Sequence, residues 1–267
     1  MRSATSRALR ALPTLLRVGV AETVAYRAEF LVWMLTSTMP LVMLALMSSI
    51  ARERPFKGYT EAGFVTYYLS VLIVRQLTGN WVAWQMGEEI RNGSLAMRLL
   101  RPIHPFIAFA SSHAAAIPFR SVIALPIAII LLVTTGAPGL ANPLQLALLV
   151  PSIAIAWMLT FAILFAIGSL SFWITQSMAV ANLYFGLYTV LSGYLIKIDM
   201  MGRFAKIISW LPFRFMLSAP VELITDRLTN DQILEIVGGQ LAWTAVIGMT
   251  ALSVWRAGVR HFEAVGG

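Results

Sequence analysis

The sequence predicts an all-α integral membrane protein with six transmembrane helices in a single transmembrane domain, residues 1–267. Of its 267 residues, 58% are hydrophobic and only 12% are charged. A soluble domain has about 25% charged residues, so this chain cannot cover a globular surface with water-soluble groups. The apolar residues also gather into stretches of about 20 residues or more, the length that a helix needs to cross the hydrocarbon core.

The net charge of +8 would suggest nucleic-acid binding in a soluble protein. In a membrane protein, basic residues flank the cytoplasmic ends of spans and meet anionic headgroups. We therefore expect the lipid bilayer as a partner and no nucleic acid. The sequence contains no cysteine, which excludes disulfides and thiolate metal sites.

Residues 1–27 predict an amphipathic helix that lies in the membrane interface. In "MRSATSRALRALPTLLRVGV" the leucines fall on one side of a helical wheel, and Arg7, Arg10 and Arg17 fall on the other. Such a helix places its arginines among the headgroups. The alternative is an unstructured tail.

Six segments are long and apolar enough to span the bilayer. They are residues 28–50, 64–87, 114–135, 143–175, 177–196 and 232–255. The fourth is over-long and contains Pro151, which predicts a tilted or kinked helix. Only Gln176 separates the fourth from the fifth, which predicts a tight helical hairpin.

We expect a location in the inner (cytoplasmic) membrane, and the distribution of basic residues favours both termini on the cytoplasmic side. In this orientation ten arginines lie on the cytoplasmic side and eight basic residues on the outer side. The short outer loop near residues 136–142 is uncharged, and long segments such as residues 197–231 translocate largely regardless of charge.

The charged segment, residues 88–105, lies between the second and third predicted spans. Asn92-Gly93 predicts a helix end, and Ser94 is a candidate N-cap for a new helix over residues 95–101. Pro102 would end that helix. The result is a short amphipathic knob on the cytoplasmic face that suits a groove on a soluble partner; the alternative is a solvated loop.

Residues 197–231 predict re-entrant helices at the outer face. The stretch "FAKIISWLPFRFMLSAPVELI" is apolar, but Pro212 and Pro220 interrupt it. It is too short for a clean span, and irregular backbone at membrane depth must be buried in protein or line a cavity. Two short helices with Trp210 at the interface would suit it.

Arg75 lies near the middle of the second predicted span, where an arginine costs roughly 2.5–3.5 kcal/mol on translocon scales. Gln76 and Asn80 make the same part of the span polar. Two interpretations stay open. Either Arg75 pairs with polar groups of a neighbouring helix, or Arg75, Gln76 and Asn80 line the path of a substrate.

The stretch "LTGNWVAWQMGEEIRNGSLAMRLLRPIHPF", residues 77–106, resembles the corresponding region of permease subunits of type-2 ATP-binding-cassette (ABC) exporters. The resemblance extends to "YRAEFLVWMLTSTMP" and to the six-span layout, so it covers nearly the whole chain. It implies that the charged segment contains a coupling helix that docks on a separate ATPase subunit. The docking residues would be Glu88, Glu89, Arg91, Leu95, Met97, Arg98, Leu99 and Arg101.

The resemblance also implies that the re-entrant helices seal the outer end of the pathway. The candidate residues of this outer gate are Trp210, Pro212, Phe213 and Phe215. Two ABC ATPase copies and a second permease subunit would complete the transporter. The motif over residues 77–106 favours a heterodimer of two different permeases, with a homodimer as the alternative.

The chain has no G-x-x-x-x-G-K-[ST] phosphate loop, so ATP and Mg are expected on the partner ATPase and no cofactor on this chain. Neither metal-ligand spacing nor a G-x-S-x-G motif occurs. We therefore expect a transport subunit and not an enzyme. Its substrate would be amphipathic or hydrophobic, such as a drug, a lipid or a glycan-like molecule, exported from the cytoplasm or inner leaflet.

Two other functions are weighed against export. A non-transporting scaffold of a multi-protein machine would use the same cytoplasmic knob, and the sequence does not exclude it. An ATP-independent secondary transporter would need carboxylates within its spans. Because Glu29, Glu61 and Glu235 all lie at predicted span ends, this second alternative is less favoured.

Overall fold

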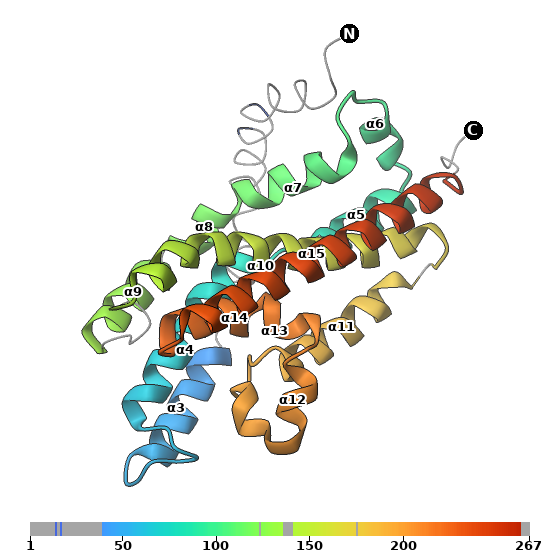
Figure 1. The fold of residues 1–267 in the computed structure, drawn as a ribbon. Coiled ribbons are helices and arrows are strands. Elements are labelled where there is room, and N and C mark those ends of the chain that lie inside the picture. Colours follow the sequence, from blue (N-terminus) through green and yellow to red (C-terminus); the bar gives the residue numbers. More distant parts are fainter. Residues whose placement is uncertain are drawn as a thin grey trace.

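A computed structural model describes residues 39–122, 124–135, 141–174 and 176–262, together with Thr14 and Arg17 (Figure 1). The helix predicted over residues 1–27 and the beginning of the span predicted over residues 28–50 lie outside the described residues, except for these two positions. Within the described residues the fold is helical and has no strand, so the all-α class is confirmed.

Fifteen helical elements follow one another in the described chain. The first seven are α3 (Met39–Ala51), α4 (Glu61–Thr78), α5 (Val82–Arg91), α6 (Leu95–Leu99), α7 (Pro105–Ala115), α8 (Ile117–Ser121) and α9 (Ala124–Thr135). The others are α10 (Pro143–Ser169), η2 (Leu170–Phe172), α11 (Ser177–Leu191), η3 (Ile198–Phe204), α12 (Ala205–Ile208), α13 (Pro212–Met216), α14 (Ser218–Thr225) and α15 (Asn230–Val259).

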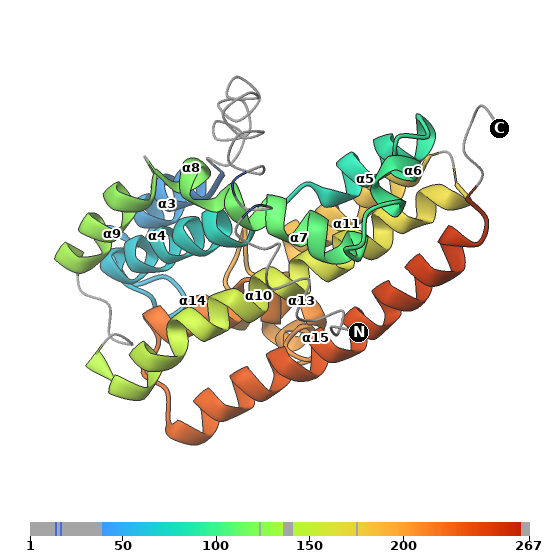
Figure 2. The same ribbon diagram turned by 90° about the horizontal axis from the view of Figure 1, so that it is seen from above.

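Helices α10 and α15 are the longest elements and run parallel, side by side (Figure 2). Ser152 Oγ donates to Gln240 Oε1 at 2.8 Å in the first half of both helices, and the rings of Phe165 and Trp255 are 5.2 Å apart near their C-terminal ends. In the described part of the chain, Pro143–Phe172 and Asn230–Val259 are each long and apolar enough to cross a membrane alone. At 1.5 Å per residue, 30 residues extend about 45 Å, so both fit a tilted crossing.

The second and third predicted spans are broken into several helices. Gly79 is extended (φ −63°, ψ 145°) and ends α4, because Gly and the following Asn80 are poor helix formers. Helix α5 then continues to Arg91. In the third span, α7, α8 and α9 succeed one another, and Pro118 in the first turn of α8 explains why a new helix begins there.

The remaining bounds differ less from the prediction. Helix α11 ends at Leu191, earlier than the predicted residue 196, because the chain turns at Gly193 with φ of 86°. Helix α15 extends beyond both predicted ends and begins at a capping box between Thr229 and Gln232. The hairpin near Gln176 is present, with the Oγ atoms of Ser171 and Ser177 2.6 Å apart. Residues 197–231 form four short helices in place of two.

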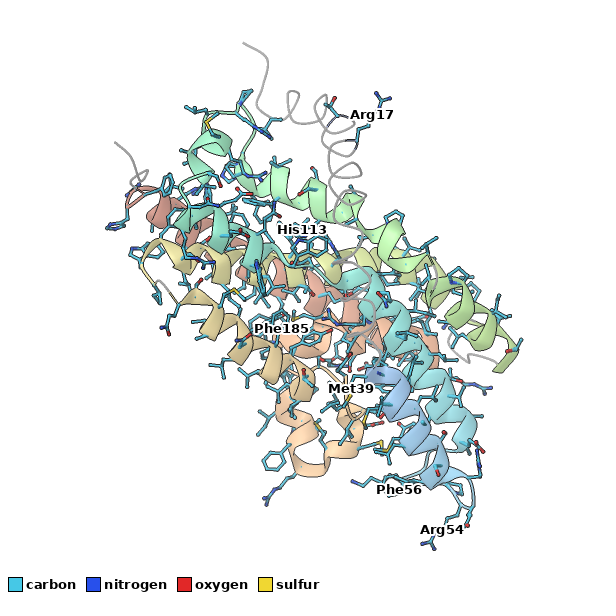
Figure 3. All side chains as sticks on the ribbon, turned by 180° about the vertical axis from the view of Figure 1, so that it is seen from behind. Arg17, Met39, Arg54, Phe56, His113 and Phe185 are labelled. Atoms are coloured by element: carbon cyan, nitrogen blue, oxygen red, sulfur yellow. The ribbon has the colours of Figure 1, made fainter. Side chains whose placement is uncertain are left out.

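The molecule has two distinct ends (Figure 1). Helix α6 and the C-terminal end of α15 lie together at one end, which we call the α6 end; there the rings of His104 and Trp255 are 6.4 Å apart. The α3–α4 loop and α12 lie at the opposite α12 end, where Lys57 Nζ donates to the carbonyl of Met200 at 2.8 Å. Figure 3 shows Arg54 and Phe56 at this second end.

Candidate functional site

An ion pair fixes α6 to the body of the molecule. Arg98 donates from Nε to Glu89 Oε2 at 2.8 Å and from Nη2 to Glu89 Oε1 at 2.6 Å. The two side chains are only 18% and 15% exposed, and the guanidinium lies 4.0 Å from the centre of the Phe109 ring on α7. Because a bidentate pair fixes direction as well as distance, α6 is joined firmly to α5 and α7.

The turn before α6 differs in one respect from the prediction. Gly93 has φ of 77°, which confirms the left-handed helix end. The N-cap prediction for Ser94 is wrong, because this residue is itself helical (φ −65°, ψ −17°) and has no capping hydrogen bond. Asn92 Oδ1 accepts from both the Ser94 amide at 3.0 Å and its Oγ at 2.6 Å, so an Asx-type turn sets the direction of α6.

The predicted docking residues divide into an inward and an outward set. Leu95 is fully buried, Leu99 packs partly buried against the core, and Glu89 and Arg98 pair with each other. The outward set is Glu88, Arg91, Met97 and Arg101.

Leu100, which sequence reasoning missed, belongs with the outward set. It is 79% exposed and Met97 is 67% exposed. Leu100 follows Met97 by three residues, a spacing that places both side chains on one face of a helix. This spacing is the signal that could have identified Leu100 from the sequence. The tip of the protrusion is therefore apolar, with basic residues beside it.

Arg75 lies about midway along the broken span formed by α4 and α5. It is 14 residues after Glu61, or roughly 20 Å along α4 at 1.5 Å per residue, and 13 residues before Glu88. Its guanidinium carbon lies 5.4 Å from the centre of the Tyr188 ring on α11, and it also interacts with the side chain of Tyr194. No described carboxylate forms an ion pair with Arg75.

Gln76 and Asn80 are buried near Arg75 along the chain, but no described contact joins either of them to its side chain. Asn80 is 6% exposed, and neither its Oδ1 nor its Nδ2 has a hydrogen-bond partner in the described structure. A buried amide in this state costs about 1–3 kcal/mol. The polar part of this span is therefore poorly satisfied within the described chain.

The predicted outer-gate residues lie at and near the α12 end in different environments. Trp210 is 70% exposed, and its carbonyl accepts from Trp243 Nε1 at 3.1 Å. Pro212 begins α13. Phe213 lies 6.2 Å from the Tyr184 ring, and Phe215 is buried, with its carbonyl accepting from Gln240 Nε2 at 3.0 Å. Phe213 therefore attaches α13 to α11, and Phe215 attaches α13 to α15.

Two ion pairs that sequence reasoning did not single out hold the short helices together. Arg214 Nη2 donates to Glu222 Oε2 at 2.8 Å, with the side chains 19% and 14% exposed. Lys197 Nζ donates to Asp226 Oδ1 at 2.7 Å. The paired residues are 8 and 29 positions apart, which are not the helical spacings that reveal a pair in sequence.

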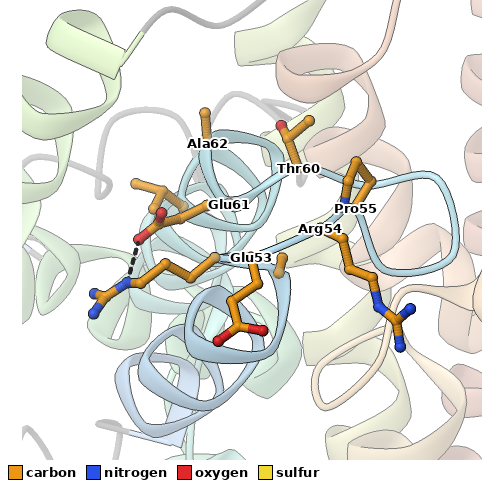
Figure 4. A pocket seen from close by; sticks show the side chains of 9 residues that line it. Glu53, Arg54, Pro55, Thr60, Glu61 and Ala62 are labelled. Carbon is orange, nitrogen blue, oxygen red and sulfur yellow. Dashed lines mark ion pairs between the residues drawn. The ribbon is translucent and has the colours of Figure 1, made fainter.

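A shallow hollow of about 500 Å³ opens beside the α3–α4 loop (Figure 4). Arg52, Glu53, Arg54 and Glu61 supply opposite charges to its lining, and Arg52 Nε lies 3.6 Å from Glu61 Oε1. Both partners of this ion pair are well exposed. The hollow thus lacks the enclosed apolar walls of a small-molecule site. No cluster of three His, Asp or Glu residues that could hold a metal ion occurs in the described chain.

The apolar helices are those of a multi-helix membrane protein, with a protrusion at the α6 end and a polar centre in the second predicted span. The family model described as ABC-2 family transporter protein matches residues 31–266. The chain therefore belongs to this family, as its resemblance to type-2 ABC permeases indicated. No curated protein matches it.

Family membership makes the chain a membrane-embedded transport component that is not itself catalytic. It also implies partnership with an ABC ATPase.

Proposed function

We propose that this chain is the membrane-spanning permease subunit of an ATP-driven exporter, with ATP and Mg handled by a separate ABC ATPase. The observation that carries the proposal is the construction of α6. Its tip exposes Met97 and Leu100, while the Glu89–Arg98 pair and buried Leu95 fix its other side. A rigid protrusion with an apolar tip both docks on a partner and transmits the partner's movement into α5 and α7.

In this proposal the α6 end faces the cytoplasm, and two permease subunits stand above two ATPase copies. The second permease is a different chain, as the motif over residues 77–106 favours. An amphipathic or hydrophobic substrate leaves the cytoplasm or inner leaflet when ATP-driven movement of α6 rearranges the helices. Helices α13 and α14, held by Phe213, Phe215 and the Arg214–Glu222 pair, close the outer end of the path.

The test is co-purification of the ATPase with the tagged chain in detergent. We expect the double variant Met97→Asp, Leu100→Asp to retain about one tenth or less of the bound ATPase, because removing apolar anchors from the centre of an interface costs at least about 1.4 kcal/mol. The matched control is Phe204→Asp, Ile207→Asp, which changes two exposed apolar residues at the α12 end. This control should retain the ATPase.

Two results would count against the proposal. One is a wild-type chain that carries no ATPase; the other is an α6 variant that inserts normally and binds as much ATPase as the wild type. Equal loss in both double variants would show a general folding defect. In that case the single variant Leu100→Ala, which removes apolar area without adding charge, gives the deciding comparison.

A further inference from the structure

Arg75 differs from the other partly buried cations of the described chain. Arg98, Lys197 and Arg214 each form an ion pair, with Glu89, Asp226 and Glu222 respectively. Arg75 has no such carboxylate among the described residues, although it lies deepest in the predicted membrane region. A charge removed from water needs a partner, so a counter-ion for Arg75 is to be sought outside the described chain.

The surroundings of Arg75 are aromatic. Tyr184, Tyr188 and Tyr194 are all buried; the rings of Tyr184 and Tyr188 are 6.1 Å apart, and those of Tyr188 and Tyr194 are 6.2 Å apart. The guanidinium lies 5.4 Å from the Tyr188 ring centre. A cation–π contact of this kind uses the charge of the guanidinium and the face of the ring. Apart from the interaction with the Tyr194 side chain, the remaining N–H donors of the guanidinium can therefore serve an anion.

The side of α4 that carries Arg75 is also accessible. Val74 and Gln76, its neighbours on either side, are buried, whereas Arg75 keeps part of its surface exposed. Next to Tyr184 and Tyr188 in the sequence, α11 presents a row of exposed apolar side chains: Leu183, Leu187 and Val190. A cationic point beside an exposed apolar helix face is complementary to a molecule with an anionic head and an apolar tail.

We propose that Arg75, together with Tyr188 and Tyr194, binds the anionic head group of an amphipathic substrate. The head group is a phosphate or a carboxylate, either of which a guanidinium holds with two parallel hydrogen bonds. Its apolar tail lies along Leu187 and the neighbouring exposed face of α11. This inference rests on the proposed export function, because it names the class of molecule that such a transporter would carry.

The experiment measures binding to the purified full chain in nanodiscs of phosphatidylcholine. The probes are lysophosphatidic acid, lysophosphatidylcholine with the same acyl tail, and inorganic phosphate alone. We expect the Kd of the wild type for lysophosphatidic acid to be about tenfold lower than its Kd for the choline lipid. Inorganic phosphate should not compete at millimolar concentration, because it lacks the tail.

Substitutions at Arg75 and Tyr194 test whether this site causes the preference for the anionic lipid. Arg75→Gln should bind both lipids equally, and Arg75→Lys should keep a weakened preference, since lysine is a point charge without the two-pronged geometry. Arg203→Gln removes an exposed arginine at the α12 end and should behave like the wild type. If Arg75→Gln does not fold, Tyr194→Phe removes one hydroxyl and keeps the ring, and should reduce the preference several-fold.

Three outcomes would overturn the inference. They are a wild type without any preference for the anionic lipid, a preference that survives in both Arg75→Gln and Tyr194→Phe, and binding of inorganic phosphate as tight as that of the lipid. Each is independent of the export proposal, which stands or falls on whether the ATPase co-purifies with the wild type. A chain that binds the ATPase but ignores head-group charge would keep its function and lose only this substrate class.

Discussion

Lys197 lies between α11 and η3 and ties this part of the chain to Asp226, the residue directly after α14. Its Nζ donates to both carboxylate oxygens of Asp226, at 2.7 and 3.0 Å, and lies 4.7 Å from the centre of the Tyr59 ring. The hydroxyl of Tyr59 in turn donates to Asp199. Burial by itself lowers the pKa of Lys197, but the Asp226 carboxylate outweighs it, and the pKa lies above its ordinary value. Burial and the hydrogen bond to Asp199 raise the pKa of Tyr59.

These shifts predict that the Lys197 network stabilises the protein through the physiological pH range. Because the folded-state pKa of Lys197 is raised above its ordinary 10.5, the stabilisation is complete below that pH and is lost as pH rises through the folded-state pKa. Lys197→Met should reduce stability by about 1.5–3 kcal/mol at neutral pH, the value of a charged hydrogen bond. The thermal midpoints of wild type and variant in detergent should therefore converge only above about pH 10.5.

The control for this measurement is Lys206→Met, which removes an exposed lysine on α12 and should shift the midpoint little at any pH. Convergence of wild type and Lys197→Met between pH 5 and 8 would instead assign the pH dependence to another group.

At the same scale, the sequence identified the candidate positions but not their partners. Arg98 looked like a docking residue because it is a cation on a short amphipathic helix. The structure pairs it with Glu89, nine residues earlier, which depends on the turn at Gly93. The tyrosines beside Arg75 are more than 100 residues away in the chain, and only the packing of α4 near α11 brings them there. Contacts that depend on turn geometry or tertiary packing leave no local pattern.

Among the elements, the long apolar helices were the most predictable. Helices α10 and α15 are predominantly apolar over lengths of 27 and 30 residues, so that their existence follows from composition. The break between α4 and α5 was not predicted, because Gly and Asn within an apolar run also occur in continuous transmembrane helices. The bounds of α13 and α14 depend on packing of Phe215 and on the Arg214–Glu222 pair, which the prolines alone do not specify.

The crossing of α10 with α5 depends on a single glycine. A Cβ added at Gly168 would lie 2.8 Å from Met86 Cε and 3.0 Å from the Cα of Ala83. Met86 can move its flexible end, but the backbone of Ala83 cannot move without displacing α5. Since α5 leads directly to α6, this crossing connects the protrusion to the longest helices of the fold.

We therefore expect Gly168→Val to destabilise the protein by about 1–3 kcal/mol, the usual cost of overpacking a close contact. Gly248→Val is the matched control, because nothing lies within 4 Å of a Cβ added there on α15. Thermal midpoints in detergent would show the difference. A Gly168→Val protein as stable as the Gly248→Val protein would mean that α5 and α10 can separate at little cost, so that their crossing does not hold the protrusion in place.

For the whole molecule, the arrangement of the two ends relative to the membrane decides whether α6 can meet an ATPase. The α6 end carries Arg91, Arg101, Arg256 and Arg260 in short segments next to the long helices. The α12 end has basic residues too, but many of them lie in the long segment before α15 and are mixed with acids. Short basic segments favour the cytoplasmic side, whereas long ones have little influence.

The absence of cysteine from the sequence makes this orientation directly measurable, because each introduced cysteine is the only thiol in the chain. Arg54→Cys in the α3–α4 loop and Arg101→Cys after α6 both replace exposed residues, at opposite ends of the molecule (Figures 1 and 3). In intact cells, a membrane-impermeant maleimide should label Arg54→Cys at once and Arg101→Cys only after permeabilisation. The reverse pattern would place Met97 and Leu100 outside the cell. No cytoplasmic ATPase could then bind them, and the exposed tip of α6 would need a partner on the other side of the membrane.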